Sequence, residues 1–114
     1  MSEDVKAFYE EFKKSGGKLQ KEAPAVMNGF GGLFKGVMAE GALSAAEKEA
    51  VAVGIAVAVQ CSPCIYLHVQ KAAGAGLSRA QILEAAGVAV MMGGGPAYTH
   101  MPEVLNACEA LGIE

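Results

Sequence analysis

Apolar residues recur at helical spacing near the start of the chain. Within residues 4–15 they stand three or four positions apart, at Val5, Phe8, Tyr9 and Phe12. This spacing gives a helix one apolar face and therefore predicts an amphipathic helix. Glycine is disfavoured inside helices and common just past their ends. We therefore expect this helix, which lies in an N-terminal segment of residues 1–22, to end at Gly16-Gly17.

A second helix is predicted to begin at Pro24, because proline fits the first helical position. Larger apolar residues follow at helical intervals, at Met27, Phe30, Phe34 and Met38. Four glycines interrupt the same stretch, at positions 29, 31, 32 and 36. Each glycine weakens the helix, although glycines also allow a neighbour to approach closely. We expect the segment to end at Gly41.

Residues 50–59 fit either a buried strand or a helix, because every position in this run is apolar. Just before the run, Ser44 and Glu47 have the spacing of a capping box, in which each side chain bonds the other residue's backbone at a helix start. The capping box and the combined length of about 16 residues favour a helix over residues 44–59. Because such a helix is apolar on all sides, we expect it at the centre of the core.

Two more helix starts follow. Pro63 suits the first turn of a helix that extends to about Ala73. Ser78 and Gln81 then form a second capping box at the start of another helix.

The glycine-rich stretch of residues 93–96 interrupts that helix, and a last helix is expected from Pro96 or Pro102 to Leu111. The pattern as a whole predicts an all-α fold, a compact bundle of about six helices that forms one domain over residues 1–114. A thioredoxin-like fold is the alternative, because a strand, a C-x-x-C motif and a helix also fit residues 50–73. It would need several more strands, and no other segment has a convincing strand pattern.

The composition adds an expectation about assembly. Apolar residues make up 53% of the chain and charged residues only 18%, whereas soluble domains average about 25% charged residues. The charges in residues 50–114 are few: Lys71, Arg79, Glu84, Glu103, Glu109 and Glu114. A monomer would expose large apolar patches, which usually mark interfaces. We therefore expect a homo-oligomer, with a very apolar monomer as the alternative.

Charge and hydropathy also bear on partners and location. The net charge of −3 argues against nucleic-acid binding. The apolar run is shorter than the roughly 18 residues that span a membrane. The start, Ser2-Glu3-Asp4, lacks the basic and apolar regions of a signal peptide. We expect a cytoplasmic protein with no membrane partner.

The residues with the clearest chemical pattern are Cys61-Ser62-Pro63-Cys64 and His68. On one helix, spacings of three and four place Cys61, Cys64 and His68 on a single face. A helix start favours a thiolate at Cys61, and C-x-x-C thiols commonly have a lowered pKa. An imidazole beside a thiol can accept its proton. The pattern indicates two-electron thiol chemistry, in which one sulfur attacks a peroxide or disulfide and the other resolves the intermediate.

A carboxylate that orients His68 would make it a better base, and the nearest candidates are Glu47 and Glu49. If residues 44–59 pack antiparallel to residues 62–73, either carboxylate could reach the imidazole, and the spacing alone does not choose between them. The simpler interpretations are a capping role for Glu47, a first-turn helix position for Glu49, and a buried structural role for His68.

The remaining candidates have weaker patterns. Cys108 is expected to be an inert core cysteine, and buried structural cysteines are also the alternative for the C-x-x-C pair. Tyr98 and His100 follow a glycine-rich turn and could line a pocket, although an ordinary surface or core position is the simpler interpretation. A structural zinc site would need four ligands, and outside the motif only His68, His100 and Cys108 are available.

Taken together, these residues resemble the alkylhydroperoxidase D-like, or carboxymuconolactone decarboxylase, family. The resemblance rests on Glu49, the C-x-x-C motif and His68, within a core of residues 41–96. The resemblance implies an all-α fold that assembles into trimers or hexamers. It also implies a proton relay through Glu49, His68, Cys61 and Cys64, which selects Glu49 over Glu47.

Family peroxidases reduce organic hydroperoxides and are recycled by a dithiol such as a lipoyl protein, so the resemblance implies a peroxidase of antioxidant type with no cofactor. The best-known peroxidases of the family carry histidine where this chain has Pro63, and they are longer. The expected substrate is therefore a small hydroperoxide or a disulfide, and the expected reductant is a lipoyl- or thioredoxin-type dithiol.

Two other functions stay open. One is a cofactor-free lyase or isomerase like the family's decarboxylases, with His68 as acid and base, although those members usually lack the C-x-x-C motif. The other is a non-enzymatic assembly or metal-binding module that uses Cys61, Cys64 and His68.

Overall fold

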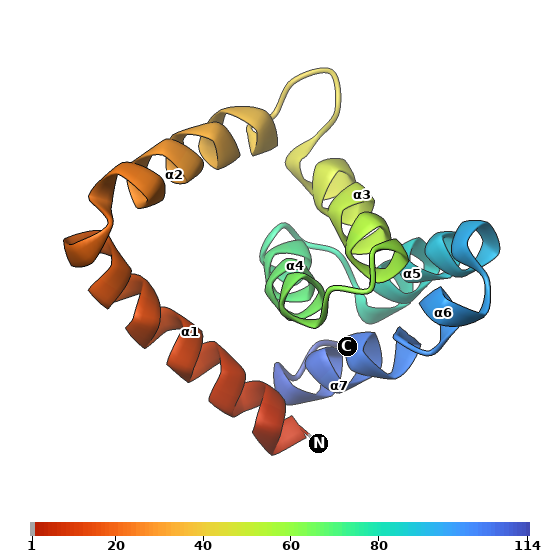
Figure 1. Cartoon of the computed structure of the whole chain (residues 1–114). Helices are drawn as coiled ribbons and strands as arrows, with labels where there is room; N and C mark the ends of the chain where they lie inside the picture. The colour runs from red at the N-terminus through yellow and green to blue at the C-terminus, as the bar shows by residue number, and fades with distance from the viewer. Residues whose placement is uncertain (1) are drawn as a thin grey trace.

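A computed structural model describes residues 2–114, and all of its regular structure is helical (Figure 1). The elements are α1 (Ser2–Glu22), α2 (Pro24–Met38), α3 (Ala45–Ala58), α4 (Ser62–Gly74), α5 (Arg79–Gly93), the four-residue α6 (Gly95–Tyr98) and α7 (Met101–Ala110). Residues 2–114 contain no strand. The all-α prediction is confirmed, and the thioredoxin-like alternative is wrong.

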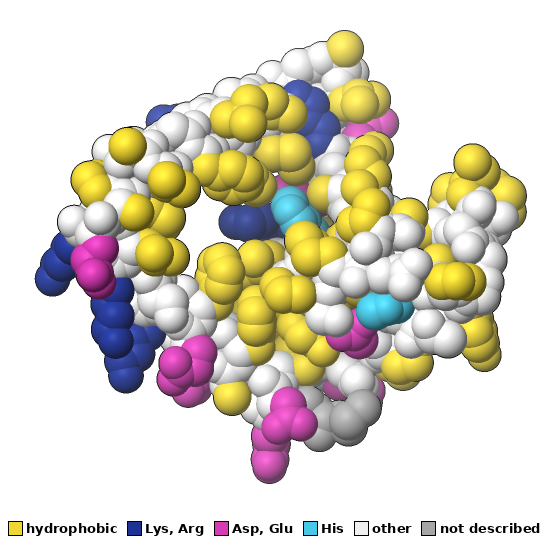
Figure 2. Space-filling model, in the orientation of Figure 1, with side chains coloured by type: hydrophobic (Ala, Val, Ile, Leu, Met, Phe, Trp, Pro, Cys, Tyr) yellow, Lys and Arg dark blue, Asp and Glu magenta, His cyan; other side chains and the backbone are white. Residues whose placement is uncertain are grey.

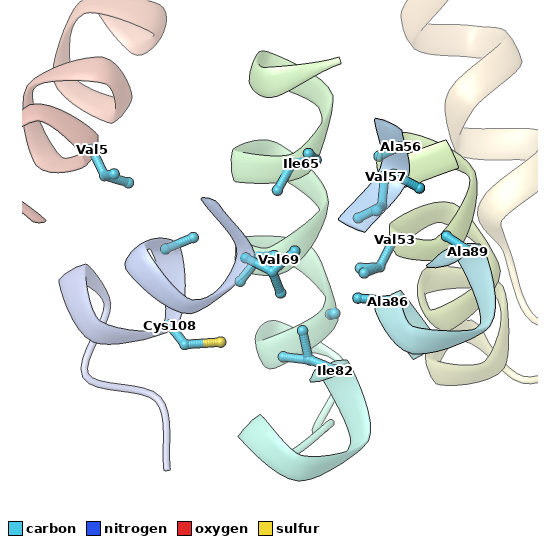
Figure 3. Close-up of a cluster of buried hydrophobic side chains, with 14 residues drawn as sticks. Val5, Val53, Ala56, Val57, Ile65, Val69, Ile82, Ala86, Ala89 and Cys108 are labelled. Atoms are coloured by element: carbon cyan, nitrogen blue, oxygen red, sulfur yellow. The ribbon is translucent and has the colours of Figure 1, made fainter. Parts of the chain in front are cut away.

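The core lies among α3, α4, α5 and α7, with α4 in the middle (Figure 3). Ile65 and Val69 of α4 are fully buried, and Val53 and Val57 of α3 face them from one side. Cys108 of α7 is fully buried on the other side, as predicted for an inert core cysteine. Because α4 carries both Cys64 and His68, the candidate site is built on the central helix of the core.

Both predicted capping boxes are present. Ser44 accepts a hydrogen bond from the Glu47 amide while the Glu47 carboxylate accepts one from the Ser44 amide. Ser78 and Gln81 make the same reciprocal pair at the start of α5. These bonds satisfy amides that a helix start would otherwise leave unpaired, and they explain why α3 and α5 begin where they do.

The sequence suggested that the first helix ends at Gly16-Gly17, and this prediction is wrong. α1 continues through both glycines to Glu22. Added side chains at these glycines would meet no atom within 4 Å, so no close contact requires them. The helix ends only at Ala23, whose ψ of 58° departs from the helical range, because the following Pro24 excludes that range sterically.

α2 forms one side of a wide V with α1 (Figure 1). None of its residues is buried, although Met27, Phe34 and Met38 are half-buried. The α2 glycines have no atom within 4 Å of an added Cβ. The close packing that these glycines would permit is therefore not made within one chain.

One other expectation needs correction. α3 is not enclosed on all sides: it buries Val53 and Val57, but Val51 and Ile55 on its other face are more than half exposed. Of the two starts expected for the last helix, the one at Pro102 is confirmed, because α7 begins at Met101 and residues 95–98 form the separate short α6. No helix in residues 2–114 has the length and apolar character needed to cross a bilayer.

Candidate functional site

A tight turn between α3 and α4 sets the position of the C-x-x-C motif. α3 ends with two hydrogen bonds, from the Gln60 amide to the Val57 carbonyl (3.1 Å) and from the Cys61 amide to the Ala56 carbonyl (3.1 Å). This is the Schellman pattern, and it needs a left-handed residue, here Gln60 with φ of 58°. Cys61 therefore completes the end of α3 and also begins α4.

Cys61 is the N-cap of α4, and its sulfur accepts a hydrogen bond from the Cys64 amide at 3.3 Å. Cys61 and Cys64 form a disulfide, with their Cα atoms 5.2 Å apart. The prediction that these two sulfurs meet at a helix start is confirmed in geometry. Amides at this end of α4 favour negative charge, so they would stabilise a thiolate when the pair is reduced.

His68 and Glu49 meet across the α3–α4 interface. The imidazole Nδ1 lies 2.8 Å from Oε1 of Glu49, and its N–H donates to the carboxylate. The Glu49 side chain is only 9% exposed and that of His68 is 21% exposed. Among the residues whose burial the structure describes, Glu49 is the one charged residue that is buried. Of the two candidate carboxylates, the structure brings Glu49 to His68 and leaves Glu47 in its capping box.

The bond to Glu49 decides which nitrogen of His68 is available. In a neutral imidazole with its proton on Nδ1, the other nitrogen, Nε2, has a free lone pair and can accept a proton from a thiol. The imidazole and Cys64 line the same cavity, which has a volume of about 380 Å³. The arrangement brings together a base, a group that orients the base, and a cysteine of the disulfide pair at one cavity.

The cavity is apolar apart from His68 and the cysteine. Its lining comes from three helices: Phe30, Leu33, Phe34, Val37 and Met38 of α2, Ala52, Ile55 and Ala56 of α3 with Val59 beyond it, and Cys64 and His68 of α4. Figure 2 shows hydrophobic side chains gathered around the hollow between α2 and the rest of the molecule. Such a lining favours a ligand with an apolar body.

A second histidine–carboxylate pair lies at the start of α7. Nδ1 of His100 donates to Oε1 of Glu103, and the Tyr66 hydroxyl donates to Oε2 at 3.1 Å. Burial alone would raise the pKa of Glu103, but hydrogen bonds from Ser62, His100 and Tyr66 outweigh it and lower that pKa. Ser62 lies inside the C-x-x-C motif, so this carboxylate ties the motif to α7.

Sequence reasoning missed Glu103 as a contact of the motif, and it treated His100 as an isolated candidate. The three-residue spacing of His100 and Glu103 at a helix start is the signal that would have paired them. Cys108, which is far from the motif in sequence, has a pKa raised chiefly by burial. Within residues 2–114, no three His, Cys, Asp or Glu side chains gather where a metal ion could be held.

Comparisons with known proteins agree with this architecture. An uncharacterised protein of Cupriavidus necator is 33% identical over 111 residues, which cover 97% of this chain and 98% of the relative. The uncharacterised protein 4 in the cox locus of Paracoccus denitrificans is 37% identical over 95 residues, covering 83% of this chain and 86% of the relative.

Solved structures show the same fold. A carboxymuconolactone decarboxylase family protein from Legionella pneumophila, in its apo form, superposes with a TM-score of 0.87 at 36% identity, over 93% of this chain and 95% of that one. A family protein from Thermotoga maritima, for which a part in the antioxidative response has been suggested, has a TM-score of 0.80 at 24% identity, over 93% and 90%. The model of the carboxymuconolactone decarboxylase family matches residues 24–107. The helical fold, the relatives and this match agree: the chain belongs to the carboxymuconolactone decarboxylase family.

Proposed function

We propose that this protein is a dithiol oxidoreductase that reduces small organic hydroperoxides or disulfides with Cys61 and Cys64. The observation that carries the proposal is the Cys61–Cys64 disulfide beside an imidazole that a buried carboxylate orients. A structural disulfide would need no base, whereas a reactive pair needs one to form its thiolate. The suggested antioxidative role of the Thermotoga maritima protein is consistent with this chemistry.

The reaction with a hydroperoxide balances as follows. One thiolate attacks the terminal peroxide oxygen, the O–O bond breaks, and the alkoxide leaves with a proton as an alcohol. The attacking cysteine becomes a sulfenic acid. The second thiol attacks that sulfur, water leaves, and the Cys61–Cys64 disulfide forms. A dithiol of lipoyl or thioredoxin type then returns two electrons and two protons and is itself oxidised.

His68 is the proton carrier in this scheme. Its Nε2 takes the thiol proton and delivers it to the leaving alkoxide, while Glu49 holds Nδ1 and stabilises the positive charge that the ring gains. Cys64 shares the cavity with His68, whereas Cys61 gains more from the helix start. Either sulfur can therefore make the first attack.

The apolar cavity supports a substrate with an alkyl or aryl body. A hydroperoxide seated there would have its apolar part against α2 and α3 and its peroxide near Cys64. This favours an organic hydroperoxide over hydrogen peroxide.

The direct test is a thiol titration of the reduced protein before and after one equivalent of cumene hydroperoxide. We expect the number of titratable thiols per chain to fall from three to one, the thiol of the buried Cys108. One equivalent of cumyl alcohol should form at the same time. Recycling with dihydrolipoamide, glutathione and thioredoxin, tested side by side, identifies the class of reductant. If all three thiols survive, the peroxidase assignment is wrong. Activity on a lactone that persists in a Cys61→Ser, Cys64→Ser variant would instead support the lyase alternative.

A further inference from the structure

α2 is attached to the rest of the molecule at a few defined points. At its C-terminal end, Nζ of Lys48 donates to the carbonyls of Val37 (2.7 Å) and Ala39 (2.6 Å). At its N-terminal half, Nε2 of Gln20 in α1 donates to Oδ1 of Asn28 at 3.0 Å. Between these ends, the side chain of Phe34 reaches the candidate site.

Phe34 contacts two residues of α4 that stand one helical turn apart. Its ring stacks on the imidazole of His68, with centroids 5.9 Å apart and planes inclined by 28°. Nζ of Lys71 lies 4.9 Å from the centroid of the same ring, where the negative face of the aromatic ring attracts a cation. The ring is therefore fixed against α4 by both contacts.

The bond to Glu49 and the Phe34 contact constrain His68 in different ways. The bond from Nδ1 to Glu49 fixes one edge of the imidazole, but a single hydrogen bond leaves the ring free to tilt about that edge. The flat contact with Phe34 fixes the plane of the ring. Together, the two contacts determine where Nε2 stands relative to the cavity.

We propose that Phe34 is a positioning residue, which holds the imidazole of His68 in the plane required for proton transfer at the thiol pair. The proposal rests on the proposed function above. It gives α2, which otherwise has no buried residue, a defined role in the reaction. A small displacement of a proton-transferring group can reduce a rate up to about a hundredfold, so one face contact can matter for catalysis.

Phe30 offers a matched comparison on the same helix. It lies one turn before Phe34 and lines the same cavity. The centroids of the two rings are 6.2 Å apart. Its side chain is 65% exposed, and within residues 2–114 no ring contact joins it to His68. Phe30→Leu therefore changes the cavity wall, while Phe34→Leu changes the wall and also removes the contact with the base.

The kinetic test follows disulfide formation in the reduced full-length protein at increasing concentrations of cumene hydroperoxide. We expect Phe34→Leu to lower the rate constant at saturation about tenfold, and Phe34→Tyr, which keeps the ring face, to restore most of it. We expect Phe30→Leu to act mainly on the half-saturating concentration. Phe12→Leu, on the exposed part of α1, serves as the control for removal of a surface aromatic ring. Equal losses of the saturated rate constant in the Phe30 and Phe34 variants would overturn the proposal.

A second measurement does not depend on peroxidase activity. Long-range proton–nitrogen NMR correlations report which nitrogen of His68 carries the proton. We expect a single tautomer, protonated on Nδ1. We also expect the ring current of Phe34 to shift the resonances of the His68 ring protons. We expect Phe34→Leu to remove that shift and to broaden the ring-proton signals of His68, because the imidazole can then tilt about its bond to Glu49. Ring-proton signals as sharp as those of the wild type would overturn the role of Phe34, whereas a wild-type protein that does not react with hydroperoxide would overturn only the proposed function.

Discussion

At the scale of single residues, the candidate site depends on one buried ionisable contact. The side chain of Glu49 is 9% exposed, and its Oε1 lies 2.8 Å from Nδ1 of His68. A buried carboxylate without a partner is costly, so each member of this pair stabilises the other in place. The contact joins residues 19 positions apart, and it exists because α3 and α4 pack against each other.

Replacing Glu49 by Gln tests this contact. The amide keeps the shape but no longer stabilises a protonated imidazole, so we expect the rate of disulfide formation with cumene hydroperoxide to fall about 10- to 100-fold. The reduced protein should keep its helical circular dichroism. Glu47→Gln is the matched control, because it lies on the same helix in a capping box. A rate that falls equally in both variants would contradict the role given to Glu49.

Glu103 gives a prediction about acid stability. Because hydrogen bonds in the folded protein lower its pKa, its ionised form stabilises the fold above the ordinary carboxyl pKa. That contribution is lost as the pH falls through the lowered pKa of the folded state. We expect the free energy of unfolding, measured with urea, to fall between about pH 5 and pH 3, and to fall less steeply in Glu103→Gln. A variant that is as stable as the wild type at pH 7 and equally sensitive to acid would disagree with this account.

The residues of the candidate site could be predicted from the sequence where they lie close together along the chain. Cys61, Cys64 and His68 share one helix start, so their proximity followed from helical geometry. Glu49 could not be chosen from the spacing alone, because Glu47 stands only two positions before it. Phe34 and Glu103 were beyond this reasoning altogether, since their contacts join α2 and α7 to α4 and depend on how helices pack.

At the scale of helices, capping residues predicted the helix starts correctly, whereas glycine did not predict the end of α1. Ser44 and Ser78 begin α3 and α5 as predicted, because a side chain at an N-cap satisfies backbone amides directly. Gly16 and Gly17 do not end α1, because glycine inside a helix costs only about 1 kcal/mol and no alternative turn is stabilised there. Pro24, which excludes the helical conformation sterically from its neighbour, sets the boundary instead.

The glycines in α1 make a stability prediction. Both lie in a regular helix with open space where a Cβ would stand. Gly16→Ala and Gly17→Ala should each stabilise the protein by roughly 0.5–1 kcal/mol, seen as a higher melting temperature. Gly112, whose φ is 65°, provides the opposite case, because alanine is strained in that conformation. A melting temperature lowered by the α1 substitutions would show that this helix is not formed as described.

At the scale of the whole molecule, apolar surface remains uncovered. Val51 and Ile55 of α3 and Val88 and Met92 of α5 are 52–76% exposed and line an apolar groove of about 440 Å³. α2 adds Val26, Phe30, Leu33 and Val37, each 58–68% exposed. Patches of this kind usually mark interfaces. The composition had already indicated this exposure, but which helices carry it required the packed structure.

We expect the groove between α3 and α5 to be covered by further copies of the same chain, in a trimer or hexamer. Light scattering coupled to size-exclusion chromatography measures the assembly directly. A double substitution, Val88→Lys with Met92→Lys, places charges in the groove and should dissociate the assembly. A substitution of the exposed polar surface, Lys14→Glu, is the control. A wild-type protein that elutes as a monomer at micromolar concentration would contradict the expectation.

The turn at Gln60 and Cys61 has a consequence for how this protein can vary in length. Because Cys61 completes the end of α3 and begins α4, an inserted or deleted residue between Val59 and Pro63 would disrupt both helix ends and separate the sulfur from its partner. The α2–α3 loop around Gly41 meets no such double requirement. Natural or engineered changes in loop length should therefore be tolerated before α3 but should disrupt the fold after it. We accordingly expect the number of residues between Glu49 and Cys61 to stay constant.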